Sequence, residues 1–229
     1  MQIIDYAKRS VIKRFFPYKL SAERNYYHGT YPPEPNQPIL SDYILYMIGI
    51  DAIKKDDKLL NLVVDYGCGC GYGSKLIANS LDCKVIGIDY SKEAIRYAKR
   101  HNNHPLVKYL QADLNGSFSS IDADYAFFIE TIEHLKKPFR ALEKINKSTG
   151  RFVFISTPKE PENCKIYSWH ISPFTPHLVA ELKLKFTITD LGLLRLFNDL
   201  DSDTIFTDDI SDYVVHDEEL GSNYLWLFY

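Results

Sequence analysis

Two carboxylates and an imidazole stand close together after a hydrophobic run, in the segment FFIETIEHL of residues 127–135. On a helix, positions i, i+3 and i+4 share a face, so we expect Glu130, Glu133 and His134 to project together. This set could bind Mg²⁺ or Mn²⁺, which would lower the pKa of an acceptor hydroxyl. Alternatively, His134 alone is a general base, or the two acids only favour the positive start of a helix.

A second imidazole, His170, follows a later strand-like segment. In a parallel sheet it would reach the same edge, so we predict a fourth ligand or a second acid–base group. A simpler interpretation is that Thr175 caps and Pro176 opens the next helix, with Trp169 and His170 packing the loop beneath it.

A glycine-rich turn follows the buried-type strand predicted at residues 60–66, with glycines at positions 67, 69, 71 and 73. Glycine lets the backbone approach a ligand closely. Because Tyr72 breaks the GxGxxG spacing of pyrophosphate-binding loops, the pattern favours a ligand without a pyrophosphate.

Two further acids follow the next predicted strands. The strand at residues 84–89 ends in Asp89, whose carboxylate can accept both hydroxyls of a ribose. The strand at residues 106–111 leads into Asp113, which we expect at the amino group of an adenine. The order and spacing of these features predict a nucleoside site.

Short β-rich segments alternate with helical patterns through the middle of the chain, which predicts a parallel sheet. Two more strands, at residues 185–190 and 224–229, are expected to close the sheet as an antiparallel pair. The remaining strands are expected at residues 124–129 and 151–156, and the helices at 72–81, 91–102 and 138–148.

Residues 59–157 resemble the class I S-adenosylmethionine-dependent methyltransferases in VVDYGCGCG (63–71), IGIDYS (86–91) and QADL (111–114). The resemblance implies an α/β, Rossmann-like sheet of seven mostly parallel strands with a reversed last strand and helices on both faces. It also implies S-adenosylmethionine as the cofactor, with its methionine end at the glycine loop. The implied cofactor-binding residues are Asp65, Gly67, Cys68, Gly69, Gly71, Asp89, Tyr90, Asp113, Leu114 and Glu130.

A narrower resemblance, in FFIETIEHL and in STP at residues 156–158, is to the ubiquinone-biosynthesis O-methyltransferase branch. The resemblance implies a bound metal in some relatives with E-x-x-E-H, such as quinone O-methyltransferases and plant small-RNA terminal methyltransferases. Many other relatives keep Glu-His and bind none. We expect O-methylation of a small-molecule hydroxyl, on a quinone precursor or a sugar. The alternatives are an RNA terminal 2'-O-methyltransferase, a cofactor-binding protein without catalysis and a nicotinamide oxidoreductase.

The composition of this 229-residue chain limits the kinds of partner and environment that we expect for it. A net charge of −3 and a pI near 6.2 give no general attraction to nucleic acid. The four cysteines form no CxxC pair and predict reduced thiols in a cytoplasmic protein. The apolar run at residues 43–50 is much shorter than the roughly 20 residues of a membrane span.

The proline-rich stretch separates an N-terminal helical extension or cap, residues 1–56, from a core at residues 57–229 that the resemblance implies is a class I methyltransferase domain. Residues 1–20 are predicted to form a basic amphipathic helix, which would be a lid or a peripheral membrane contact. The proline-rich stretch 26–38 carries Tyr26, Tyr27, His28 and Tyr31, candidates for the acceptor pocket. The acidic insert, residues 198–223, has no Lys or Arg and predicts a solvated loop, while oligomeric state stays open.

Overall fold

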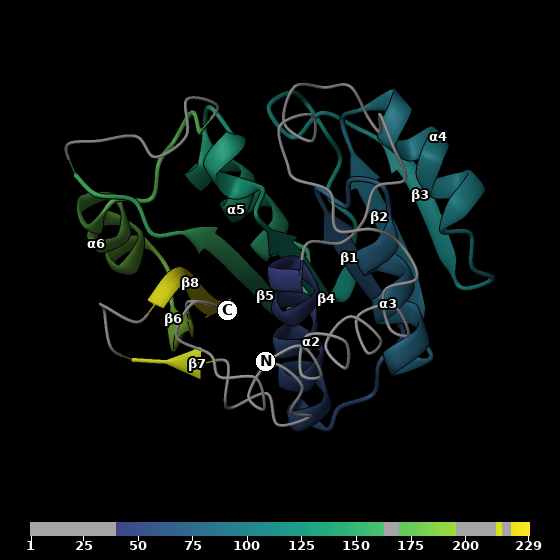
Figure 1. Ribbon diagram of the computed structural model, residues 1–229, viewed down its shortest axis with the longest axis horizontal. Helices are drawn as coiled ribbons and strands as arrows, with labels where there is room; N and C mark the ends of the chain where they lie inside the picture. The colour runs from purple at the N-terminus through teal and green to yellow at the C-terminus, as the bar shows by residue number, and fades with distance from the viewer. Residues whose placement is uncertain (1–39, 163–169, 196–213, 217–220) are drawn as a thin grey trace, which may run out of the picture.

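The computed structural model describes residues 40–162, 170–195, 214–216 and 221–229, which build a sheet of order β3-β2-β1-β4-β5-β8-β6-β7. Figure 1 shows this sheet running across the molecule. The strands are β1 Leu62–Tyr66, β2 Lys84–Asp89, β3 Val107–Gln111, β4 Ala123–Ile129, β5 Thr149–Pro158, β6 Ile188–Arg195, β7 Val214–Val215 and β8 Gly221–Phe228.

Strands β1 to β5 are mutually parallel, and β8 lies antiparallel between β5 and β6. This confirms the mostly parallel sheet with a reversed last strand. One difference is an eighth strand, since β7 pairs antiparallel with β6 at the edge. Part of the insert expected as a loop therefore extends the sheet, because Val214 and Val215 are β-branched residues that suit a half-buried edge.

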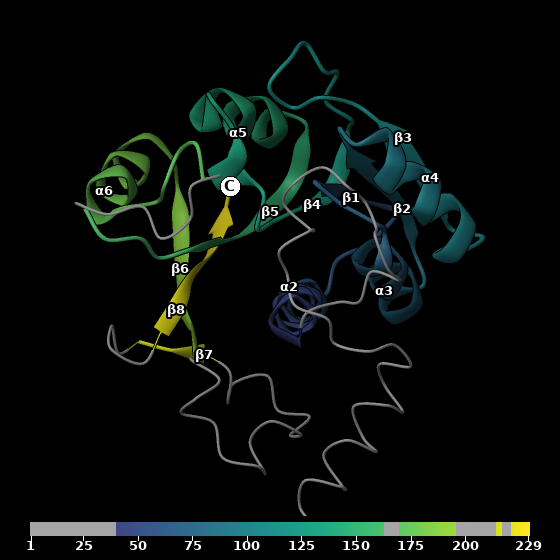
Figure 2. The same ribbon diagram turned by 45° about the horizontal axis from the view of Figure 1, so that its top comes forward.

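Helices cover both faces of the sheet (Figure 2), with α2 and α3 on one face and α5 and α6 on the other. Ser91 and Thr175 cap α4 and α6 by accepting hydrogen bonds from Ala94 N and Leu178 N, and Pro176 opens α6 as predicted. The helices are α2 Leu40–Asp56, α3 Tyr72–Leu81, α4 Lys92–His101, α5 Pro138–Lys147 and α6 Pro176–Lys185, with a 3₁₀ turn, η1, at Ile132–His134.

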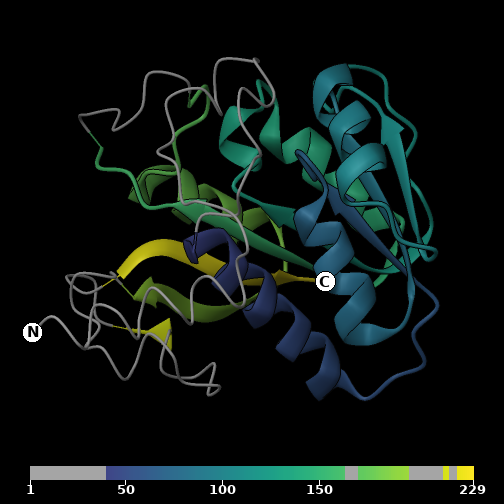
Figure 3. The ribbon, with the colours of Figure 1, turned by 45° about the vertical axis from the view of Figure 1, so that its right-hand side comes forward.

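Helix α2 was not predicted from the sequence. It lies beside α3 (Figures 1 and 3) and contributes Ile44, Leu45 and Ile50 to the hydrophobic core. Gly49 allows a close approach to the sheet, since a Cβ there would lie 2.4 Å from Cε1 of Phe127. Within the described residues, no helix has both the length and the apolar character that crossing a membrane requires.

Candidate active site

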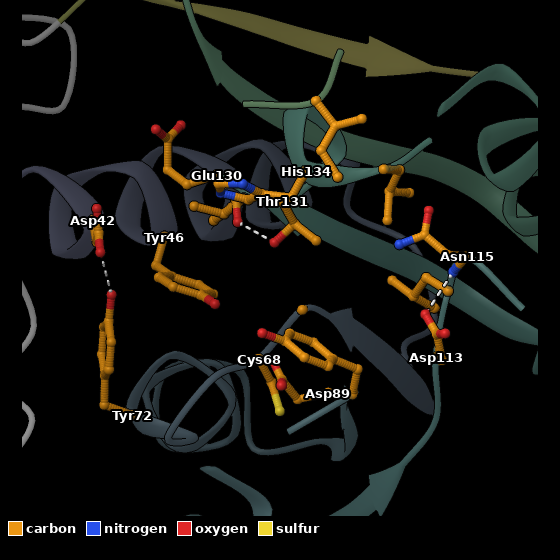
Figure 4. A pocket seen from close by; sticks show the side chains of 16 residues that line it. Asp42, Tyr46, Cys68, Tyr72, Asp89, Asp113, Asn115, Glu130, Thr131 and His134 are labelled. Atoms are coloured by element: carbon orange, nitrogen blue, oxygen red, sulfur yellow. Dashed lines mark hydrogen bonds between the residues drawn. The ribbon is translucent and has the colours of Figure 1, made fainter. Parts of the chain in front are cut away.

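A cavity of about 410 Å³ opens at the carboxyl ends of β1 to β4. Parallel α/β sheets bind ligands at this edge, where the strand order reverses between β1 and β4. In Figure 4, Asp89 and Asp113 lie on one side of the cavity, and Glu130 and His134 lie across from them. Most of the predicted cofactor residues, and Glu130 and His134 of the predicted acceptor group, therefore line a single cavity. Asp65, Gly69, Gly71, Glu133 and His170 are not part of its lining.

The glycine loop forms one wall of this cavity. Gly67 has a φ of 78°, and a Cβ there would lie 2.1 Å from Oγ1 of Thr131, so no larger residue fits. The amides of Gly67 and Cys68 both donate to the carbonyl of Ile88, at 2.8 and 2.9 Å, which ties the loop to β2. Gly67 and Cys68 line the cavity as predicted.

Asp89 is held by two backbone amides at the end of β2. Its Oδ2 accepts from Gly69 N at 3.0 Å, and its Oδ1 accepts from Ser91 N at 2.8 Å. Each carboxylate oxygen has a second lone pair, so both can also accept a ribose hydroxyl. Burial raises the pKa of Asp89, whereas the two amides oppose that rise. Tyr90 beside it is exposed and also lines the cavity.

Asp113 lies after the end of β3. Its Oδ1 accepts from Asn115 N at 2.9 Å, and Asp113, Leu114 and Asn115 all line the cavity. Figure 4 shows Asp113 and Asn115 together at one end of the cavity. This placement suits the predicted contact with an adenine, because a carboxylate and an amide offer hydrogen bonds at a base edge.

Asp65, a predicted cofactor residue, lies behind the cavity lining and is fully buried. Its carboxylate accepts from the hydroxyls of Ser74, at 2.6 Å, and Tyr46, at 3.0 Å. Burial raises the pKa of Asp65 to about 6, against the opposing effect of these hydrogen bonds. Direct contact between Asp65 and a cofactor stays a prediction.

Helix α2 supplies cavity residues that the sequence did not reveal. Tyr46 lines the cavity in front of Asp65, and Tyr72 donates to Oδ2 of Asp42 at 3.0 Å (Figure 4). The glycine pattern indicated only the loop itself. Gly73 was a possible signal, because a Cβ there would lie 2.0 Å from Cζ of Tyr46.

The expected shared helical face of Glu130, Glu133 and His134 is wrong. Glu130 has a φ of 45° and precedes η1, which contains only three residues. Its Oε1 accepts from Oγ of Ser156 at 2.9 Å and from Nδ2 of Asn223 at 3.0 Å. The left-handed backbone at Glu130 breaks the helical spacing, and its side chain bonds residues of β5 and β8. Burial, followed by the negative charge of Asp42, raises the pKa of Glu130 to about 8.

Glu133, His134 and His170 do come together. One ligand atom from each lies within 4.8 Å of the others. Nε2 of His134 lies 3.6 Å from Oε1 of Glu133, and the His134 and His170 rings meet edge to face with centroids 5.0 Å apart. Burial and then the charge of Glu130 raise the pKa of Glu133, whose Oε2 accepts from Thr157 at 3.2 Å.

The chemistry of this donor set suits a divalent metal. Imidazole favours transition metals, and a carboxylate adds a hard oxygen. Of the four predicted metal ligands, Glu133, His134 and His170 fit such an ion together, whereas Glu130 lies outside the group. His134 alone of the three lines the cavity, so it connects the group to the acceptor side.

Glu160, which no sequence pattern indicated, lies against His170. Its Oε1 contacts Nδ1 of His170, and both side chains are buried. Its position two residues beyond the end of β5, at the same sheet edge as the cavity, was the available signal. Cys68, Cys70 and Cys83 are buried free thiols. Cys164, Trp169, Tyr26, Tyr27, His28 and Tyr31 lie outside the described residues.

The sheet order, the glycine loop and the strand-end acids define a Rossmann-like, class I methyltransferase fold. Comparisons agree: a family model described as a methyltransferase domain matches residues 64–154. A probable S-adenosylmethionine-dependent methyltransferase of Mycobacterium tuberculosis is 26% identical over 136 residues, 58% of this chain and 48% of the relative. Residues 64–154 therefore match a methyltransferase domain and are similar to S-adenosylmethionine-dependent methyltransferases.

Solved structures show the same fold. A plantazolicin methyltransferase in complex with S-adenosylhomocysteine superposes with a TM-score of 0.60 at 15% identity, over 99% of this chain and 98% of that chain. The methyltransferase domain of a bacterial Hen1 protein gives 0.58 at 20% identity, over 83% and 99%. The match to a methyltransferase domain, together with such S-adenosylhomocysteine complexes, supports S-adenosylmethionine as the cofactor. The chain spans at most about half the length of the curated relatives it matches.

Proposed function

We propose that this protein transfers the methyl group of S-adenosylmethionine to a hydroxyl of a small molecule, with His134 at the reacting oxygen. The observation that carries the proposal is that His134 lines the same cavity as Asp89 and Asp113. It is the one imidazole among the described lining residues. A cofactor bound to the two aspartates would therefore leave its sulfonium methyl group facing the side of the cavity that holds His134.

His134 can act as the general base of this reaction. As the acceptor oxygen attacks, the carbon–sulfur bond breaks, S-adenosylhomocysteine leaves, and the hydroxyl proton passes to the imidazole. Oε1 of Glu133 lies 3.6 Å from Nε2 of His134, where an ionised Glu133 would stabilise the imidazolium electrostatically. The buried contacts behind His134 keep its ring oriented for this transfer.

A metal is the second way in which the same residues can activate the hydroxyl. Glu133, His134 and His170 would hold a divalent cation, which when bound lowers the pKa of a coordinated hydroxyl. Glu133 and His170 are buried, so the protein would enclose one side of such an ion and leave the His134 side toward the cavity.

The proposed class of acceptor is based on the family resemblance of the sequence. The resemblance to the ubiquinone-biosynthesis branch favours a quinone precursor, and a sugar is the other proposed acceptor. Residues 1–20, proposed as a lid or peripheral membrane contact, and residues 1–56, proposed as a cap, lie wholly or mainly outside the described residues.

A terminal RNA 2'-hydroxyl is a second candidate acceptor. The Glu133, His134 and His170 group supports it, because the E-x-x-E-H resemblance includes small-RNA terminal methyltransferases. Charge argues against it. The cavity lining that the structure describes carries four carboxylates, from Asp42, Asp89, Asp113 and Glu130, and neither Lys nor Arg. Such a surface repels phosphates.

The test combines binding and methyl transfer. Calorimetry should show binding of S-adenosylmethionine and none of NAD. Transfer of radioactive methyl is then measured to 3,4-dihydroxybenzoate, methyl glucoside and a single-stranded RNA oligonucleotide, each with Mn²⁺ or with EDTA. Transfer to RNA alone would replace the small-molecule proposal with the second candidate.

His134→Ala is the decisive variant. We expect S-adenosylmethionine affinity to change less than about twofold and turnover to fall by about 10²–10⁴-fold, the range for loss of a general base. The exposed His177, on α6, supplies the matched control His177→Ala. Normal turnover in His134→Ala at saturating cofactor would remove His134 from the chemistry.

A further inference from the structure

A buried carboxylate, Glu160, lies behind the group formed by Glu133, His134 and His170. Its side chain is 0% exposed, and it contacts the 3% exposed side chain of His170. A carboxylate in the interior is costly unless it is paired and hydrogen-bonded. No described part of the cavity lining includes Glu160, so cofactor binding does not explain its position.

The contact between Glu160 and His170 determines how the imidazole ring is used. An ionised carboxylate only accepts hydrogen bonds, so beside ionised Glu160 it is Nδ1 of His170 that carries the proton and donates it to Oε1. The lone pair of the imidazole is then on Nε2, at the other side of the ring. In this tautomer, Nε2 is the atom through which His170 can bind a cation.

The backbone around His170 is fixed to the same neighbours. Ser172 N donates to the carbonyl of Glu133 at 2.9 Å, and its hydroxyl donates to the carbonyl of Leu135 at 2.7 Å. Glu160 N donates to the carbonyl of Phe174 at 3.3 Å. These bonds hold the His170 segment against η1. The remaining freedom is rotation of the His170 ring, and the contact with the side chain of Glu160 restricts that rotation.

We propose that Glu160 is a positioning residue that orients His170 toward Glu133 and His134, so that these three residues bind a divalent cation beside the acceptor. The proposal rests on the metal-dependent form of the proposed function. Ligating histidines commonly donate their second N–H to a carboxylate, which fixes the tautomer and makes the ligand more basic. Glu160 supplies that carboxylate here.

The experiment measures metal binding without any acceptor. Co²⁺ is titrated into the full chain while visible absorption is followed, and Mn²⁺ binding is measured by calorimetry. We expect Glu160→Ala to weaken both metals by about 10–100-fold, the usual effect of removing such a carboxylate. Glu160→Gln keeps a hydrogen-bond acceptor for Nδ1–H. The logarithm of its metal affinity should therefore fall by less than about a third of the fall seen in Glu160→Ala.

Glu162→Gln is the matched control, because Glu162 is exposed in the same segment and accepts from His177 N. S-adenosylhomocysteine affinity is measured in every variant, and it should stay unchanged since Glu160 does not line the cavity. Retained cofactor affinity also shows that each variant is folded. His170→Ala should abolish binding of both metals.

Three results would overturn the proposal, and they are distinguishable. Equal metal affinity in Glu160→Ala and Glu162→Gln would contradict the positioning role of Glu160 and leave the cation site of the other three residues standing. Equal losses in Glu160→Ala and Glu160→Gln would show that charge, not ring orientation, matters. If the unmodified protein binds S-adenosylhomocysteine but neither metal, the cation site fails while the methyltransferase assignment stands; absence of cofactor binding would contradict the proposed function itself.

Discussion

Replacing Asp65 with Asn should stabilise the cofactor-free protein at neutral pH. Asp65 is fully buried and has no cationic partner among the bonds recorded for its carboxylate, which accepts only from Ser74 and Tyr46. Asn has nearly the same shape and no charge. Its carbonyl can accept from one hydroxyl, and its amide can donate to the other, because a hydroxyl both donates and accepts.

The magnitude follows from the pKa of Asp65. Burial raises it from the ordinary value of 3.8 to about 6 in the folded protein. Each pKa unit corresponds to about 1.4 kcal/mol, so the charged carboxylate costs the folded state about 3 kcal/mol. Because the folded pKa is raised, the folded state binds more protons than the unfolded chain between pH 4 and 6. Stability is therefore lost as pH rises through this window, and the loss is complete above it.

The assay is urea denaturation of both proteins between pH 4 and 8. Glu130 and Glu133 titrate in both, so the difference between the two proteins isolates Asp65. We expect Asp65→Asn to be more stable by up to about 3 kcal/mol at pH 8, with the advantage vanishing near pH 4. Asp122→Asn, at an exposed position, is the matched control. An Asp65→Asn protein that is less stable at pH 8 than at pH 5, relative to the unmodified protein, would refute the burial argument.

Two further predictions concern the cavity walls. Asp89→Ala should weaken S-adenosylmethionine binding by about 10–100-fold in calorimetry, because the ribose loses a charged acceptor and the amides of Gly69 and Ser91 lose theirs; unchanged affinity would contradict the ribose role. Gly73→Ala should lower stability by about 1–3 kcal/mol in urea, since its Cβ would lie 2.0 Å from Tyr46. Gly150→Ala, whose Cβ would meet a neighbour only at 3.6 Å, is the control, and equal stability of the two variants would contradict the clash.

The alternation of β-rich segments with helical patterns was sufficient to predict the sheet, because each segment's pattern depends on residues that are near one another in the sequence. Strand β2 and helix α3 have the predicted bounds, Lys84–Asp89 and Tyr72–Leu81. Helix α2 was missed for a physical reason: residues 43–50 within it form a continuous apolar run, so they show no amphipathic period to detect. Its partners, α3 and β4, are also distant in sequence from most of its residues.

Strand ends likewise explain which parts of the site could be predicted. Asp89 is the last residue of β2 and Asp113 lies two residues after β3, and the topology brings the ends of these parallel strands to one edge. Glu130 also follows a strand, but its left-handed φ of 45° depends on Ser156 and Asn223 from other strands. No local pattern could indicate that conformation, so the predicted helical face was wrong there.

The contact between His170 and Glu160 could not be predicted from the sequence, because it depends on tertiary packing. Both lie beyond β5, where loops are positioned by contacts rather than by periodicity. His170 reaches His134 because Ser172 fixes its segment to η1 by two hydrogen bonds. Glu160 is then buried against His170, ten positions earlier in the chain. The proposed acceptor side of the cavity is therefore built from the end of β4, η1 and the loop before α6, so its chemistry depends on their packing more than on any one motif.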